Sequence, residues 1–152
     1  THHRTPNIIT SLELDPAEME KRNIHLQKKY AEIEENEVRF EELHCEDSEY
    51  LIVAFGSCAR IAQKAMEMAR EEGIKVGLLR PITLWPFPSK AIAARAAQVK
   101  GILTVELNAG QMVEDVRLAV ECKVPVEHFG RLGGIVPDPD EVITALKEKL
   151  IK

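Results

Sequence analysis

From Tyr50 onward, short apolar runs alternate with longer segments in which apolar residues recur at helical spacing. A continuous apolar run such as residues 50–55 is typical of a strand covered on both faces of a parallel sheet. Similar runs predict strands at 75–79, 101–107 and 124–129. Gly56 and Ser57 are expected to form a tight turn. Helices are predicted in the periodic segments between these strands. The first ends at Gly73, a C-terminal cap, and the second follows Pro86–Ser89 and runs to about Val99. An apolar stripe from Met112 to Val120 marks the third, and an Asp138-Pro139-Asp140-Glu141 capping box opens the last.

The N-terminal third has a different pattern. Residues 1–11 are predicted to be a linker, and Asp15 and Pro16 then open a helix that ends near Asn36. Its narrow apolar stripe must lie on another surface, either the rest of this domain or a neighbouring subunit. Residues 38–43 alternate loosely and predict a strand. The polar link that follows is too short for a parallel crossover, so we expect this strand to be the antiparallel neighbour of strand 50–55.

These elements predict an α/β fold, a three-layer α/β/α sandwich with a five-stranded, mostly parallel sheet and one antiparallel strand. The predicted organisation is a linker and N-terminal helix over residues 1–37, followed by the α/β domain over residues 38–152. Because the first residue is Thr1 and not Met, either an initiator and leader are missing or the chain is an excised piece of a longer polypeptide, and we favour the excised piece.

Composition and charge exclude several classes of protein. A formal charge of −5 argues against a nucleic-acid-binding surface, and no apolar run approaches the roughly 18 residues that a membrane span needs. No secretory signal precedes the first helix. The three cysteines are widely spaced with no CxxC, so we do not expect a zinc knuckle or a ferredoxin-type cluster. We expect them to be free thiols in a reducing cytoplasm.

The turn at Gly56 and Ser57 is a candidate weak anion site, because backbone N–H groups at a helix N-terminus attract anions. A dinucleotide fingerprint needs further glycines that are missing here, so a plain strand–helix turn is the favoured interpretation. Cys58 follows at the helix start, where a thiolate can be stabilised. We favour a small buried residue there, because no histidine lies nearby in the sequence.

Two stretches are predicted at the carboxyl edge of the sheet, where α/β proteins usually bind ligands, and a third, from Phe129 to Pro137, is predicted to be a loop with flexible glycines followed by a rigid proline. The first contains Arg80, Pro81, Trp85 and Phe87, whose prolines stiffen a loop and whose aromatic rings either cap the core or anchor another domain. A second contains Glu106 and Asn108, which either bind a ligand or cap the next helix. Arg131 lies in the third, where it could pair with a carboxylate or a phosphate. A surface salt bridge is the more frequent role of such an arginine. His44 and His128 show no metal-ligand spacing.

Taken in order, Arg80-Pro-Ile-Thr-Leu-Trp-Pro-Phe-Pro88, Val105-Glu-Leu-Asn-Ala-Gly-Gln111 and Phe129-Gly-Arg-Leu-Gly-Gly134 resemble the C-terminal domain of the α-type subunit of 2-oxoacid:ferredoxin oxidoreductases. The segment from Asn7 to Leu12 and the charged helix after it are most similar to the branched-chain, 2-oxoisovalerate (3-methyl-2-oxobutanoate) members. The resemblance implies the transketolase C-terminal fold, and a parent enzyme that decarboxylates a 2-oxoacid with coenzyme A, giving acyl-CoA and reduced ferredoxin.

The resemblance also implies the location of the cofactors. Thiamine diphosphate, Mg²⁺ and iron–sulfur clusters belong to other domains or subunits of the parent complex, so no catalytic, cofactor-binding or metal-binding residue is expected in this chain. Its implied partners are the pyrimidine-binding domain of the same subunit, the thiamine-diphosphate-binding subunit and the ferredoxin-like subunit. Two other hypotheses compete: a stand-alone nucleotide- or flavin-binding module, and the C-terminal domain of a transketolase or oxoacid dehydrogenase β subunit.

Overall fold

The computed structural model describes residues 12–151, so the linker predicted over residues 1–11 lies outside the described residues. The chain divides into two compact units between Asn36 and Glu37. Helix α1 (Pro16–Asn36) forms the described part of the first unit, and none of its residues is buried. Asp15 caps it as predicted, because its Oδ1 accepts the backbone N–H groups of Ala17 at 2.8 Å and Glu18 at 3.2 Å.

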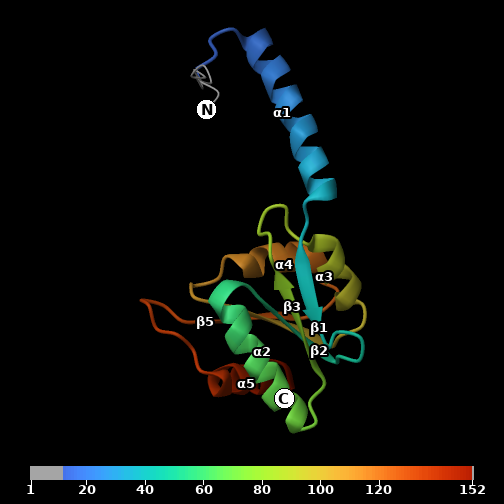
Figure 1. Cartoon of the computed structure of the whole chain (residues 1–152), viewed down its shortest axis with the longest axis vertical. Helices are drawn as coiled ribbons and strands as arrows, with labels where there is room; N and C mark the ends of the chain where they lie inside the picture. The colour runs from blue at the N-terminus through green and yellow to red at the C-terminus, as the bar shows by residue number, and fades with distance from the viewer. Residues whose placement is uncertain (1–11, 152) are drawn as a thin grey trace, which may run out of the picture. The chain divides into compact units, whose positions relative to one another are not determined.

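The second unit contains one sheet of five strands in the order β1-β3-β2-β4-β5. The strands are β1 (Phe40–Leu43), β2 (Tyr50–Ala54), β3 (Val76–Pro81), β4 (Gly101–Glu106) and β5 (Val126–Gly130). All pairs are parallel except β1 with β3. The predicted sheet and its one antiparallel strand are therefore confirmed, but the expected pairing of β1 with β2 is wrong. β2 is flanked by β3 and β4, so the open edge for β1 is that of β3 (Figure 1).

Helices cover both faces of the sheet and make the predicted three layers (Figure 1). Helices α2 (Gly56–Glu71) and α5 (Pro139–Leu146) enclose one apolar core around Leu103 and Val105, and a short π-helical segment, η1 (Lys147–Ile151), continues α5. Helices α3 (Ser89–Ala96) and α4 (Met112–Val120) enclose the other core around Ile102. The predicted capping box of α5 is present.

Two predicted helix boundaries need correction. Gly56 and Ser57 do not form a separate turn, because α2 begins at Gly56 itself. Gly56 has a φ of +56°, so the reversal of the chain takes place within the first helical residue. Helix α3 ends at Ala96, earlier than the predicted Val99.

The parallel strands bring their carboxyl ends to one edge of the sheet, which we call the carboxyl edge. The loops after β3, β4 and β5 all leave the sheet there, beside the start of α2. The stretches around Arg80 and Glu106, which the sequence predicted at this edge, therefore do lie along it, and the loop around Arg131 joins them.

Candidate functional site

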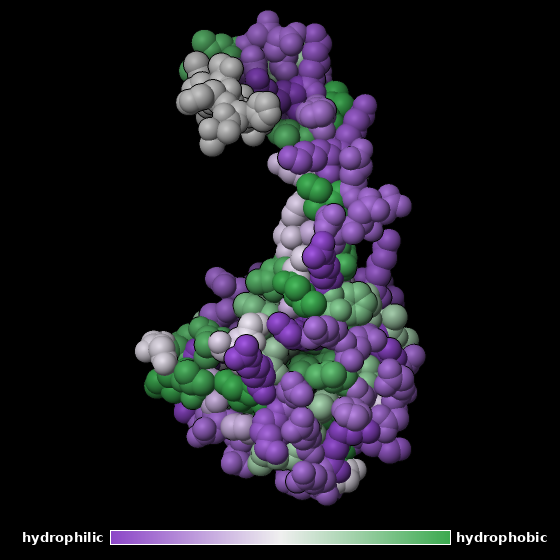
Figure 2. Space-filling model, viewed as in Figure 1, coloured by the Kyte–Doolittle hydropathy of each residue, from purple (hydrophilic) through white to green (hydrophobic). Residues whose placement is uncertain are grey.

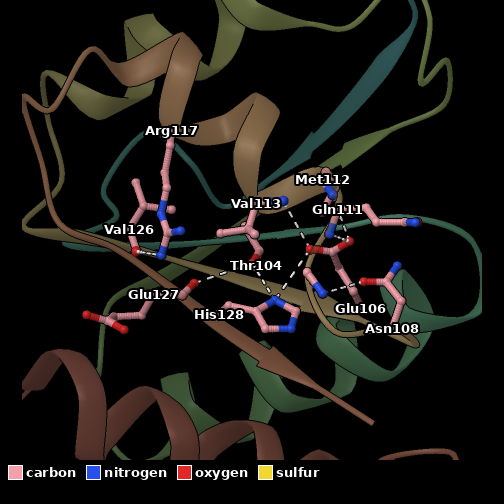
Figure 3. Close-up of polar contacts among 11 residues, drawn as sticks. Thr104, Glu106, Asn108, Gln111, Met112, Val113, Arg117, Val126, Glu127 and His128 are labelled. Carbon is pink, nitrogen blue, oxygen red and sulfur yellow. Dashed lines mark hydrogen bonds and ion pairs between the residues drawn. The ribbon is translucent and has the colours of Figure 1, made fainter. Parts of the chain in front are cut away.

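Glu106 is the central polar residue of the carboxyl edge. It is the last residue of β4, and its side chain has no exposed surface. Its Oε2 accepts backbone N–H groups from Gln111 at 3.2 Å and Met112 at 2.8 Å, and its Oε1 accepts that of Val113 at 3.0 Å (Figure 3). The first N–H groups of a helix have no intrahelical partner. Glu106 therefore caps α4 from the preceding strand, which is the second of its two predicted roles.

His128 lies beside Glu106 on the neighbouring strand, a contact that the sequence analysis missed. Its Nδ1 is 3.4 Å from Glu106 Oε1 and 3.2 Å from Thr104 Oγ1 (Figure 3). The parallel register pairs Thr104 with His128, which fixes this arrangement. The sequence did contain a signal for a polar cluster at this point. Thr104 and Glu106 are two residues apart in an otherwise apolar strand, so their side chains lie on the same face of the sheet.

Asn108 and Gly130 hold the loop after β4 against the end of β5. Asn108 Oδ1 accepts the backbone N–H of Gly110 at 2.7 Å in a local turn. A Cβ at Gly130 would lie 2.3 Å from the Asn108 carbonyl oxygen, so only glycine fits there. The backbone N–H of Arg131 donates to the Glu106 carbonyl oxygen at 3.2 Å. Asn108, like Glu106, is engaged in holding its own loop.

The two arginines of the carboxyl edge form ion pairs within the domain. Arg131 Nη2 is 2.6 Å from Glu141 Oε1, which ties the loop after β5 to the first turn of α5. Arg80 Nη1 is 2.9 Å from Glu41 Oε2 across the β1–β3 pair. The predicted salt bridge of Arg131 is therefore present, and the positive charge of each arginine is matched by a neighbouring carboxylate.

The proline-rich loop after β3 combines buried and exposed side chains. Pro81 is buried, and Phe87 packs against the core between the sheet and α3. Trp85, in contrast, keeps 54% of its surface exposed. Thr83 Oγ1 accepts the backbone N–H of Arg39 at 3.0 Å and donates to the Pro86 carbonyl oxygen at 2.8 Å, which closes the loop on itself. Of the two predicted roles for the aromatic rings, packing on the domain's own core is therefore the one that Phe87 has, whereas Trp85 is largely exposed.

The helix start at Gly56 contains no reactive thiolate. Gly56 and Ser57 are exposed, and Cys58 is buried. Burial, followed by the nearby Glu106 carboxylate, raises the pKa of the Cys58 thiol, so the neutral form predominates at physiological pH. Over residues 12–151, no group of three or more His, Cys, Asp or Glu side chains is placed to hold a metal ion. No helix in the same range has the length and apolar character of a membrane span.

Large apolar side chains project from all three loops of the carboxyl edge. Each keeps between 44% and 61% of its surface exposed, and we call the set the apolar loop patch: Ile82, Leu84, Trp85, Leu107, Leu132, Ile135 and Val136. Figure 2 shows hydrophobic residues on this side of the domain, over the loops after β3 and β5. Exposed apolar side chains gathered on loops are available to bind proteins or ligands. At this edge Glu106, Asn108 and the two arginines are therefore bonded within the domain, whereas large apolar side chains are exposed.

In the comparison with known proteins, the family model "Pyruvate:ferredoxin oxidoreductase core domain II" matches residues 48–142. The chain is 46% identical over 142 residues to the ketoisovalerate oxidoreductase subunit VorB of Methanothermobacter marburgensis, and 48% identical to that of Methanothermobacter thermautotrophicus. Each match covers 93% of this chain and 40% of the relative. The chain thus spans less than half the length of these relatives.

Two solved structures have a similar fold. One is 2-oxoglutarate:ferredoxin oxidoreductase from Magnetococcus marinus with 2-oxoglutarate, coenzyme A and succinyl-CoA bound. It matches with a TM-score of 0.76 and 25% identity, over 90% of this chain and 24% of that one. The other is a split-gene transketolase in an inactive β4 tetramer, with a TM-score of 0.63 and 21% identity over 74% of this chain and 41% of that one. The transketolase likeness is one of fold alone.

Proposed function

Because the chain belongs to the pyruvate:ferredoxin oxidoreductase core domain II family, we propose that it is a non-catalytic structural and interface domain of a 2-oxoacid:ferredoxin oxidoreductase subunit. The identity of 46–48% to VorB subunits favours a branched-chain 2-oxoacid as the substrate of the parent enzyme. In this proposal the complex oxidatively decarboxylates that acid with coenzyme A in the cytoplasm and passes the electrons to ferredoxin. The family match also favours this assignment over a transketolase or oxoacid dehydrogenase β subunit.

The contacts of the polar side chains at the carboxyl edge support a non-catalytic role. Glu106 accepts three backbone N–H groups and has no exposed surface, so it is not available to a substrate. Asn108 is engaged in its own loop, and Arg131 is paired with Glu141. The single observation that carries the proposal is this division, in which the polar side chains at the ligand-binding edge serve the domain itself while apolar side chains face outward.

The cofactors of the proposed complex do not fit the described residues. Mg²⁺, which accompanies thiamine diphosphate, binds through oxygen ligands such as carboxylates, and iron–sulfur clusters bind through cysteine thiolates. Within residues 12–151 no acidic or thiol cluster is arranged for a metal, and both Cys45 and Cys58 are buried. We therefore assign these cofactors to the partners, a pyrimidine-binding domain of the same subunit, a thiamine-diphosphate-binding subunit and a ferredoxin-like subunit.

Calorimetry with thiamine diphosphate and Mg²⁺ tests the proposal directly. We expect no heat of binding to the 152-residue chain, and no reduction of ferredoxin when it is mixed with 3-methyl-2-oxobutanoate and coenzyme A. The assembled complex is expected to reduce ferredoxin under the same conditions and to prefer branched-chain 2-oxoacids over pyruvate and 2-oxoglutarate. Tight binding of thiamine diphosphate to the chain alone would refute the non-catalytic role.

A nucleotide screen by thermal shift addresses the competing module hypothesis. Gly56 and Ser57 are exposed at the start of α2, but this turn lacks the further glycines of a dinucleotide fingerprint. We expect no change in melting temperature with nucleotides or flavins. A stabilisation that saturates with ligand concentration would favour a stand-alone binding module instead.

A further inference from the structure

Helix α1 has a narrow stripe of core-type side chains, although none of its residues is buried. Met19, Leu26 and Ile33 follow one another at intervals of seven, and Asn23 and Tyr30 lie between them, so that the five are separated by alternating steps of four and three. We call these five residues the α1 seam. Positions that repeat every 3.5 residues line the contact between two helices that wind around each other. The spacing is therefore that of a coiled coil.

The width of the α1 seam distinguishes a partner helix from a domain surface. A helix that packs on a globular domain has a stripe of about three apolar positions in every seven, whereas a coiled coil uses about two in seven. Outside the α1 seam, the only large apolar side chain of α1 is Ile24, which is 52% exposed. The other positions of the helix are charged, polar or small. A second helix is therefore a better complement to α1 than a broad domain surface.

Asn23 indicates which helix that is. A single asparagine at a core position fixes the register of a two-stranded coiled coil, because its amide group bonds to an asparagine at the same level of the partner helix. Against a wholly apolar surface the same amide would be buried without a partner, which is costly. A second copy of α1, aligned in register, places its own Asn23 at the required level. The polar residue in the α1 seam therefore favours pairing of like with like.

The charges that flank the α1 seam favour the parallel direction. One flank contains Arg22 and Lys29, and the other contains Glu20 and Glu34. In a parallel pair, Lys29 of each helix lies beside Glu34 of the other, which is the usual ionic contact of such coils. In an antiparallel pair each flank would face its own counterpart, so that basic residues would meet basic ones and acidic residues acidic ones.

We propose that α1 forms a parallel, two-stranded coiled coil with α1 of a second copy of this chain, through the α1 seam. This self-association goes beyond the proposed function, whose partners are other domains and other subunits. All five residues of the α1 seam belong to the first of the two compact units. The contact therefore makes no use of the apolar loop patch.

Sedimentation equilibrium of the 152-residue chain tests the pairing. We expect the average mass to rise from that of one chain toward that of two as the concentration increases. Leu26→Asp places a charge at the centre of the α1 seam and should raise the dissociation constant by about tenfold or more. The matched variant is Leu118→Asp, at a 78% exposed leucine of α4, and it should leave the dissociation constant unchanged. Because α1 lies in a separate unit, urea unfolding of the α/β domain should be the same in both variants.

A charge exchange separates pairing from a loss of helix within one chain. Lys29→Glu and Glu34→Lys should each raise the dissociation constant by about threefold to tenfold, because each places like charges opposite each other at two symmetric contacts. The double variant Lys29→Glu/Glu34→Lys should restore the native value. Residues five apart do not face each other on one helix, so this restoration requires a contact between two helices.

Interchain disulfides report the direction of the pair. In a Cys122→Ser background, which removes the exposed thiol, chains with Met19→Cys are mixed with chains with Ile33→Cys and oxidised. A parallel pair links two chains of the same variant, whereas an antiparallel pair links one chain of each and would overturn the proposal. A chain that stays monomeric at every concentration, or a dimer that Leu26→Asp does not weaken, would also overturn it.

Discussion

The buried carboxylate of Glu106 offers the sharpest test of how this edge is built. Replacement by glutamine keeps the size of the side chain but removes its charge. In the native domain the carboxylate accepts N–H groups from Gln111, Met112 and Val113, and Gln111 provides no side-chain cap of its own for α4. A glutamine has one acceptor oxygen, so it can face the two N–H groups near Oε2 only by turning its own NH₂ group toward the third.

The cost follows from these three bonds. One N–H, that of Val113, is left buried against another donor, which costs about 1–3 kcal/mol. The two remaining bonds lose their charge assistance and become roughly half as strong. Glu106→Gln should therefore lower the free energy of unfolding by about 2–4 kcal/mol, and Glu106→Ala, which removes every acceptor, by about 3–5 kcal/mol. Because domains of this size are stable by only about 5–15 kcal/mol, the alanine variant should be close to unfolding at growth temperature.

Urea denaturation followed by far-UV circular dichroism measures these losses. The matched control is Glu114→Gln, an exposed carboxylate in the first turn of the same helix, whose loss through the helix dipole should stay below about 1 kcal/mol. Amide exchange at Gln111, Met112 and Val113 should accelerate in the Glu106 variants alone. If Glu106→Gln unfolds at the same urea concentration as the native chain, the carboxylate is not the cap of α4 and the reasoning fails.

Three further measurements follow from other contacts. Gly130→Ala places a Cβ 2.3 Å from the Asn108 carbonyl oxygen and should cost about 1–3 kcal/mol in urea unfolding, so a neutral effect would contradict the close approach. Arg95 of α3 forms a bidentate ion pair with Glu42 of β1, with bonds of 2.9 Å and 2.6 Å. Arg95→Lys removes the bidentate geometry and should lower the free energy of unfolding by about 1 kcal/mol. An unchanged free energy of unfolding would mean that the pair is only a loose surface contact. Burial raises the pKa of Cys45 from 9.0 to about 11, so its thiol should resist alkylation at pH 8 until the domain unfolds. Since this pKa is raised in the folded state, the contribution of Cys45 to stability is complete below pH 9 and is lost as the pH rises toward 11, which urea titrations at pH 8 and pH 10.5 would detect.

Local patterns in the sequence predicted the strands, the helices and the direction of β1, because each depends on a few neighbouring residues. They did not predict that β1 pairs with β3. The short link before Tyr50 fixes a reversal of direction, whereas the partner depends on which edge remains open after β3 has paired with β2 through a helical crossover. Non-local competition of this kind leaves no trace in the residues of the link.

At the candidate site the sequence identified the residues but not their contacts. Glu106 lies five positions before Gln111, outside the usual range of a helix cap, so its role as a cap depends on how the loop folds back. The pairing with His128 comes from the register of two strands that are more than twenty residues apart in the chain. Trp85 and Phe87 looked equivalent in the sequence, and only the packing around α3 separated a half-buried ring from an exposed one.

The loops of the carboxyl edge are held at their bases by bonds within the domain and carry exposed apolar side chains beyond them. Their bases are held by bonds inside the domain, from Glu106 to the backbone of α4, from Thr83 to Arg39 and from Arg131 to Glu141. Substitutions at exposed tip residues such as Leu132 cost a domain little stability. Under the proposed interface role, partner choice can diverge among related subunits while the scaffold stays the same, and tips grafted from one relative onto another should transfer assembly preference without redesign of the core.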